Sequence, residues 1–313
     1  MKCSSIQKDI VRATAVEVEK AIAKEIGNEF FAILVDESRD VSCKEQMSLV
    51  LRFVNNEGVV VERFIGIKQV SDTSALSLKS AIYSMLLGQG LSPCSIRGQG
   101  YDGASNMSGA FNGLKTLIMK ESQSAHFIHC FAHQLQLALV FVAKNHCSIN
   151  DFFERISRLL NMIGSSYKRR DLLRKKQATH IVEALAKEFP KHELGFLRGQ
   201  LMNYINDVRG DERFSDLKGI GHLAKMMVET NKSIIYPKVY LLLKLALILP
   251  VATSTVERAF STMKLIKNDL RNKSGDQFMN DCLLSYIEKE VLDDISNEAI
   301  MDEFYRMKPR RQM

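Results

Sequence analysis

The stretch that decides the fold is FFAILVDESRD, residues 30–40. Its aliphatic first half is typical of a short buried strand, which ends abruptly on Asp36 and Glu37, where the chain leaves the core. A carboxylate held at a strand end is a common ligand for a hard divalent cation such as Mg2+. A strand-terminal Asp is also an ordinary turn residue or helix N-cap, so this segment alone leaves both interpretations open.

The composition indicates a globular chain of one large domain or two moderate ones. Of its 313 residues, 46% are hydrophobic, enough to bury a full core. The net charge of +7 permits contact with phosphate without requiring it. The six cysteines form no CxxC pair, so we expect reduced thiols in an intracellular compartment and no disulfides. The apolar run at 239–251, interrupted by Lys244, is too short to span a bilayer, so we expect no membrane segment.

The periodicity of the first half predicts an α/β order of elements. Residues 46–55 and 59–68 are strand-like and flank the polar link NEG, which predicts a hairpin. Around it we expect an amphipathic helix at 1–27, a helix at 74–88, a strand at 95–99, a helix after the Gly/Ser-rich turn at 101–114, a strand at 126–130 and a helix at 131–145. This order predicts a sheet whose first part is antiparallel.

A second aspartate, Asp102, follows the predicted strand at 95–99. If that strand lies beside the one ending at Asp36, both carboxylates project from the same edge of the sheet. Positions just beyond strand ends are the usual location of function in open α/β sheets.

Four motifs give the sequence a family resemblance: FFAILVDESRD (30–40), GQGYDGASNMSG (98–109), HCFAHQLQLAL (129–139) and LPVATSTVERAFSTMKLIKNDLRN (249–272). In this order they resemble the ribonuclease-H-like core of the hAT superfamily of DNA transposases and of the cellular proteins descended from them. The last motif, continued to residue 292, resembles the C-terminal dimerisation region of plant-type members labelled MYM-type zinc finger or TTF-type. The resemblance implies an α/β fold, with a ribonuclease-H-like mixed sheet of a hairpin plus parallel strands flanked by helices, a shortened helical insertion and a helical C-terminal region.

The resemblance also implies a third carboxylate, Glu257, on a helix that follows the sheet. With Asp36 and Asp102 it would complete an ancestral catalytic triad binding Mg2+ or Mn2+ for cleavage and transfer of DNA strands. Without the motif, Glu257 would be interpreted as a helix surface residue paired with Arg258 or Lys264.

Two further groups of residues have an ordinary structural interpretation and a functional one. Cys130 and His133 form a CxxH motif, either half of a zinc site with no convincing second half or a structural pair that shapes the strand-to-helix turn. The densest basic cluster, SSYKRRDLLRKK (165–176), is either a solvated helix face or a nucleic-acid contact. Its cations are Lys168, Arg169, Arg170, Arg174, Lys175 and Lys176.

The resemblance divides the chain into five parts. We expect an N-terminal helix (1–27), a first part of the ribonuclease-H-like core (28–149), a truncated helical insertion (150–235), a dimerisation region completing the core (236–292) and a tail (293–313). Apolar residues of the dimerisation region exceed the needs of one solvent-facing helix, and a partner chain or the sheet could cover them. The expected dimer contacts are Phe260, Leu265, Ile266, Leu283, Leu284 and Ile287.

The expected function follows from what the sequence retains and lacks. The family carries an Arg-Trp motif in the insertion, whereas this chain has no Trp, and we expect the N-terminal zinc-binding module to be absent. We therefore expect a domesticated or truncated transposase-derived protein that dimerises, with itself or a related protein, and binds DNA without membrane contact. The alternatives are a metal-dependent transposase or nuclease and a decayed fragment without selected function. The family resemblance implies a nuclear location, and without it a cytoplasmic one.

Overall fold

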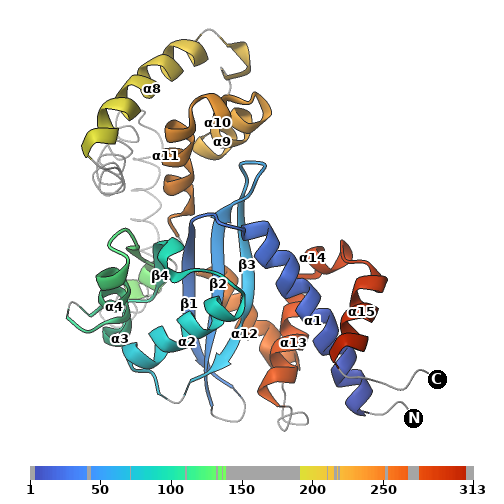
Figure 1. Cartoon of the computed structure of the whole chain (residues 1–313). Helices are drawn as coiled ribbons and strands as arrows, with labels where there is room; N and C mark the ends of the chain where they lie inside the picture. Colours follow the sequence, from blue (N-terminus) through green and yellow to red (C-terminus); the bar gives the residue numbers. More distant parts are fainter. Residues whose placement is uncertain are drawn as a thin grey trace, which may run out of the picture.

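The protein was analysed as a computed structural model, in which the described residues are 4–40, 44–70, 72–109, 111–131, 133–135, 137–138, 191–209, 211–214, 217, 219–250, 253–266 and 275–307. Its centre is a five-stranded sheet of order β3-β2-β1-β4-β5 (Figure 1). The strands are β1 (Phe31–Arg39), β2 (Glu45–Val54), β3 (Val60–Gln69), β4 (Ile96–Tyr101) and β5 (His126–His129). The first three are antiparallel, whereas β1, β4 and β5 are parallel neighbours. The predicted mixed α/β sheet is thereby confirmed.

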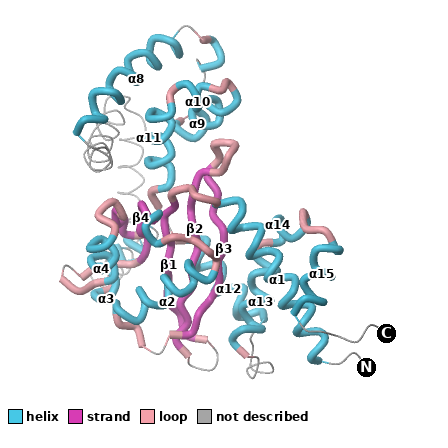
Figure 2. The backbone as a smooth tube through the Cα atoms, viewed as in Figure 1, coloured by secondary structure: helices cyan, strands magenta, loops and turns pink. Residues whose placement is uncertain are grey.

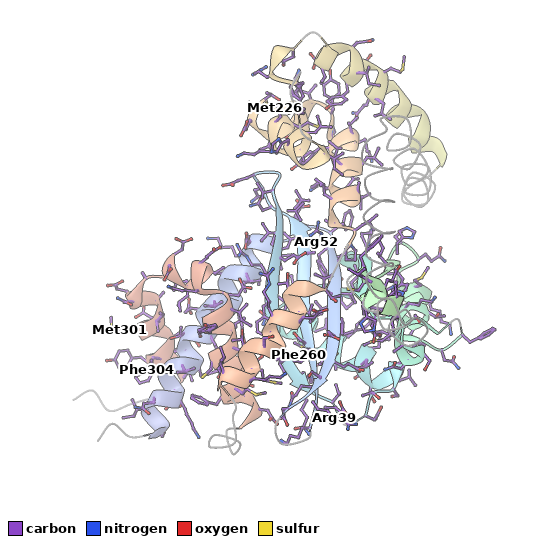
Figure 3. All side chains as sticks on the ribbon, turned by 180° about the vertical axis from the view of Figure 1, so that it is seen from behind. Arg39, Arg52, Met226, Phe260, Met301 and Phe304 are labelled. Atoms are coloured by element: carbon purple, nitrogen blue, oxygen red, sulfur yellow. The ribbon has the colours of Figure 1, made fainter. Side chains whose placement is uncertain are left out.

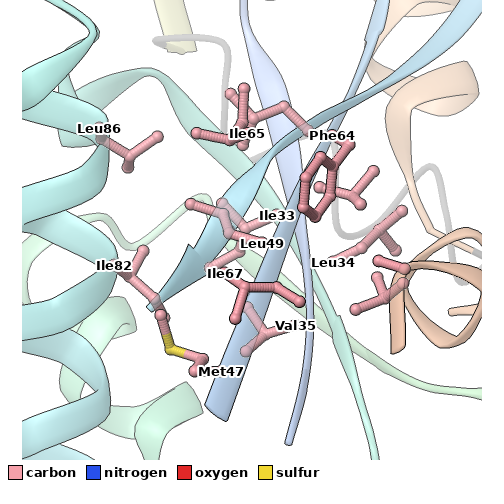
Figure 4. Packing of buried hydrophobic residues seen from close by; sticks show 14 of the residues in the cluster. Ile33, Leu34, Val35, Met47, Leu49, Phe64, Ile65, Ile67, Ile82 and Leu86 are labelled. Atoms are coloured by element: carbon pink, nitrogen blue, oxygen red, sulfur yellow. The ribbon is translucent and has the colours of Figure 1, made fainter. Parts of the chain in front are cut away.

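Helices cover both faces of the sheet, which explains why β1 is apolar without alternation. A strand buried on both sides has no solvent face to make polar. On one face lie α2 (Ala75–Gly88) and, beyond the short α3 (Ser105–Ser108), α4 (Leu114–Glu121); on the other lies α12 (Ser254–Ile266) (Figures 1 and 3). In Figure 4, Ile82 and Leu86 of α2 point toward the buried side chains of the sheet.

The outer edge of β3 is closed by the C-terminal helices. The long α1 (Ser4–Ile26) packs against α13 (Asp276–Ile287), α14 (Lys289–Asp293) and α15 (Asn297–Met307). Asn280 Oδ1 accepts a hydrogen bond from Ile67 N at 2.7 Å, and Glu288 Oε1 accepts one from Phe64 N at 2.6 Å. These side chains occupy backbone donors that would otherwise invite a further strand.

A smaller helical unit stands on the tip of the hairpin (Figures 1 and 2). It contains α8 (Lys191–Arg209), α9 (Ile220–Glu229), α10 (Lys232–Ile235) and α11 (Pro237–Ile248), with a core of its own that includes Val54 of β2. At the hairpin turn, Gly58 has φ +78, and a Cβ there would lie 2.8 Å from Ala224 O. Helix α11 begins at Pro237, whose missing N–H costs nothing in the first turn of a helix.

Candidate carboxylate site at the sheet edge

The site lies where β4 ends beside the still continuing β1. The two strands pair in parallel with Leu34 opposite Gly100, so Asp36, still within β1, lies level with Asp102, directly after β4. The prediction that the strand ends at Asp36 and Glu37 is wrong, because β1 stays paired with β2 as far as Arg39. The prediction placed Asp36 and Asp102 close together on the condition that their strands are neighbours, and β1 and β4 are neighbours. The carboxylate of Asp36 is half-buried and accepts a hydrogen bond from Glu37 N at 2.9 Å.

Glu257 reaches this edge from the opposite end of the sequence. It lies exposed in the first turn of α12, which crosses β1 and β2. Burial raises the pKa of Asp36 to about 6, and repulsion from Glu257 and Asp102 adds to the rise, while the Glu37 N–H and His133 oppose it. The three acids thus share one electrostatic environment. Neither Arg258 nor Lys264 forms an ion pair within the described part of the chain, so the surface-pair interpretation of Glu257 finds no partner there.

Glu37 is a fourth acid of this site, which the sequence did not single out. Burial raises its pKa to about 7, with Asp102, Glu45 and Asp36 adding repulsion. Asn106 Nδ2 donates to its Oε2 at 3.4 Å, whereas its Oε1 is buried without a hydrogen-bond partner among the described residues. The signal for it was its position directly after Asp36, but strand alternation alone could not show that it is buried.

The donor chemistry of the site suits a hard cation, but the arrangement is not a preformed metal centre. Carboxylate oxygens are the ligands that Mg2+ and Mn2+ prefer. A bound cation would reduce the repulsion between the neighbouring carboxylates. Among the residues that the structure describes, however, no group of three or more His, Cys, Asp or Glu side chains converges closely enough to hold a metal ion. The three acids are coupled through their charges without being assembled for coordination.

The CxxH motif divides between two roles. Cys130 is 2% exposed and its Sγ accepts hydrogen bonds from Thr253 N at 3.3 Å and Thr253 Oγ1 at 3.1 Å. The His133 ring lies 6.2 Å from that of His129, and His133 opposes the rise in the pKa of Asp36. Cys130 therefore has a structural partner far along the chain rather than in its own motif.

The glycines of GQGYDG make room for the segment that leads into α12. A Cβ on Gly98 would lie 3.0 Å from Pro250 Cδ, and a Cβ on Gly100 would lie 2.7 Å from Pro250 Cβ. On the other side of the site, a Cβ on Gly103 would lie 2.6 Å from His129 Cε1. The motif is rich in glycine because Pro250 and the His129 ring approach its backbone too closely for a side chain.

Half of the expected dimer contacts are buried within a single chain, so their assignment to a dimer interface is corrected. Phe260, Leu283 and Leu284 are 6%, 0% and 0% exposed and belong to the core of a single chain, because α12 and α13 cover the sheet and its edge. Ile266 and Ile287 are half-buried against the same core, whereas Leu265 is 67% exposed. The predicted nucleic-acid contacts at 168–176 lie outside the described residues.

The sheet order β3-β2-β1-β4-β5, with three antiparallel strands, two parallel ones and helices on both faces, defines a ribonuclease-H-like α/β protein. Residues 1–113 match the DUF4371 family, described as ZMYM1/FAM200, RNase-like domain, and residues 225–291 match the hAT family C-terminal dimerisation region. The two matches together support a transposase-derived protein of the hAT type. The second match begins within α9 and ends in α14, so it includes Glu257. No helix in the described ranges has the length and apolar character to cross a membrane.

Proposed function

We propose that this chain is a domesticated, dimeric DNA-binding protein whose sheet edge retains three acids in one electrostatic environment. The observation that carries the proposal is that the dimerisation region is packed onto the RNase-like sheet and delivers Glu257 into the electrostatic environment of Asp36. A dimer of such chains would present two copies of this edge to one DNA molecule. The partner can be a second copy or a related transposase-like protein, and the compartment that supplies the DNA is the nucleus.

The charge distribution of α12 supports contact with DNA. Arg258 and Lys264 are exposed on the helix that carries Glu257, and neither is held in an ion pair within the described ranges. Cations that are not neutralised by the protein attract phosphate and release counterions when they bind it. Their charge would also offset the repulsion between DNA and the acids beside them.

DNA affinity measured over a range of salt concentrations tests this proposal. Replacing both Arg258 and Lys264 with Ala should weaken binding and reduce the slope of log K against log salt by about 2, since each lost phosphate contact removes about 0.9. The control removes the same charge elsewhere, through Lys24→Ala with Lys289→Ala on α1 and α14, both exposed. Equal slopes for the two double variants would contradict a specific contact by α12.

Dimer formation is tested by sedimentation of the purified chain. Self-association is the property that the matched C-terminal region implies, and a dimer at micromolar concentration is the expected result. Replacing the exposed Leu265 with Ser should weaken association without unfolding the chain. A monomer at all accessible concentrations would contradict self-association and leave only a related protein as the partner.

A second candidate function is Mg2+- or Mn2+-dependent cleavage of DNA. The repulsion from Glu257 and Asp102 that raises the pKa of Asp36 favours it, because carboxylates crowded without a cation gain most from binding one. The test is metal-dependent nicking of plasmid DNA by the wild type, Asp36→Asn and Asp102→Asn. Nicking lost in both variants supports cleavage by this site. Equal background nicking by all three proteins would contradict cleavage and leave DNA binding as the proposed function.

A further inference from the structure

We propose that Phe111 is a stacking platform for a nucleobase of DNA bound beside the acids Asp36 and Asp102. The inference rests on the proposed DNA binding and adds the kind of contact that the bound strand makes. Three observations carry it: the exposure of the Phe111 ring, the closed turn that bears it, and the free cations of the helix that follows.

The ring of Phe111 stands in solvent. It is 84% exposed, more than any other large hydrophobic side chain in the described part of the chain. The large apolar residues on either side of it along the chain, Met107 and Leu114, are buried in the core. Single exposed apolar side chains are common on protein surfaces, so exposure alone does not define a site. The turn that carries the ring and the charges around it do.

The turn is held closed by its two ends. Gly113 N donates to Gly109 O at 3.2 Å, and Thr116 Oγ1 donates to the same oxygen at 3.0 Å. A Cβ on Gly113 would lie 2.3 Å from Gly109 N, so only glycine allows this close approach. Phe111, between these two glycines, therefore projects from a fixed base. A platform that is already in place loses little conformational entropy when a base stacks on it.

The residues that lead into this turn are bonded to the acids of the sheet. Ala104 N donates to Asp102 Oδ1 at 3.1 Å, and Asn106 Nδ2 donates to Glu37 Oε2 at 3.4 Å. Helix α3 thereby connects the acids to the turn with Phe111. In Figure 1, α3 and α4 lie at the side of the sheet away from α14 and α15. A strand of DNA at the acids therefore runs close to the turn.

The charges beside the turn favour DNA as the partner. Lys115 and Lys120 of α4 form no ion pair within the described residues, in contrast to Lys79 of α2, which pairs with Glu121. Cations that the protein does not neutralise attract phosphate, while an exposed aromatic ring stacks on a base. The two features together are the usual means of holding a nucleic-acid strand without reading its sequence.

A protein partner fits the turn less well. Among the exposed large hydrophobic side chains of the described ranges, no second one lies on α3, on α4 or between them. A protein interface needs a contiguous apolar patch at its centre, whereas one ring suffices for a base. The isolation of Phe111 therefore favours a nucleobase over an apolar protein surface.

The fluorescence of a single tryptophan tests the contact directly. The chain contains no Trp, so Phe111→Trp gives a full chain with one Trp, at the proposed platform. Its emission should fall when a single-stranded oligothymidylate binds, because stacking on a base quenches an indole ring. The control is Tyr305→Trp on α15, at a position that is 63% exposed, where emission should stay unchanged. Bound DNA without quenching of the Phe111→Trp protein, or equal quenching of both proteins, would overturn the inference.

Affinity for the same oligonucleotide measures how much the ring contributes. Phe111→Ala should weaken binding about tenfold, and Phe111→Tyr should stay near the wild type. The slope of log K against log salt should be unchanged in Phe111→Ala, because stacking releases no counterion, whereas Lys115→Ala should reduce it by about 0.7. Leu76→Ala on α2, at a position that is 70% exposed, is the control and should bind DNA as the wild type does.

The outcomes separate this inference from the proposed function. A wild type that binds no DNA would overturn both. Equal affinity of Phe111→Ala and the wild type would overturn the stacking contact alone. A Phe111→Ala chain that loses its dimer in sedimentation but keeps its DNA affinity would assign the ring to a protein contact instead.

Discussion

Asp36→Asn should stabilise the protein at neutral and alkaline pH. The carboxylate of Asp36 is half-buried beside two other acids, so its charge is a cost that the fold bears when no cation is bound. Asparagine is nearly the same shape, and its Oδ1 can still accept the hydrogen bond from Glu37 N. The substitution therefore removes the charge and keeps the local geometry.

The magnitude follows from the pKa of the group. A rise from the ordinary value of 3.8 to about 6 corresponds to about 3 kcal/mol at about 1.4 kcal/mol for each pKa unit, as an upper limit. Because the folded state binds the proton more tightly than the unfolded chain, wild-type stability from this group falls as pH rises from about 4 to about 7. The gain in Asp36→Asn should thus be full above pH 7 and vanish near pH 4.

The assay is urea unfolding of both proteins at several pH values, in buffer with a chelator so that no divalent cation masks the repulsion. Asp302→Asn, an exposed acid of α15, is the matched control and should leave stability unchanged within about 0.5 kcal/mol. An Asp36→Asn protein that is less stable than the wild type at pH 8, or a difference that does not depend on pH, would refute the reasoning.

Two further predictions concern packing. Gly100→Ala should lower stability by about 1–3 kcal/mol, because the added Cβ would lie 2.7 Å from Pro250 Cβ. Gly88→Ala is the control and should leave stability unchanged, since a Cβ there has nothing within 4 Å. Equal melting temperatures of the two variants in thermal unfolding would contradict the close packing of Pro250 against Gly100. Leu284→Ala should cost about 2–5 kcal/mol because the side chain is fully buried, while Leu265→Ala should change stability by less than about 0.5 kcal/mol. Similar losses of stability for the two leucine variants in denaturant unfolding would contradict the assignment of Leu284 to the core and of Leu265 to the surface.

The strands of the sheet were predictable because their signals are local. The continuous apolar run of β1 reflects burial on both faces, and the hairpin follows from two strand-like runs around a turn whose glycine needs positive φ. The helix α2 follows from apolar spacing that is bounded by a glycine. Each of these signals lies within about 15 residues of sequence, where physical preference and pattern coincide.

The parts that sequence could not give depend on contacts between distant segments. Periodicity shows that α12 and α13 have an apolar face, but not whether a sheet or a second chain covers it, so Phe260 and Leu284 were assigned to an interface although they lie in the core. The bond between Cys130 and Thr253 joins positions 123 residues apart and leaves no trace in spacing. The contact of Glu37 with Asn106 of α3 likewise joins residues far apart in the sequence.

The central claim is that Glu257, from the dimerisation region, belongs to the same site as Asp36 of the sheet. The most direct test is the pKa of Asp36, followed by NMR of carbon-13-labelled aspartate carboxyls and assigned with Asp36→Asn. Removing the charge in Glu257→Gln should lower the pKa of Asp36 from its raised value of about 6, while Glu298→Gln on α15 should leave it unchanged. A pKa of Asp36 that is the same in Glu257→Gln and the wild type would contradict the account.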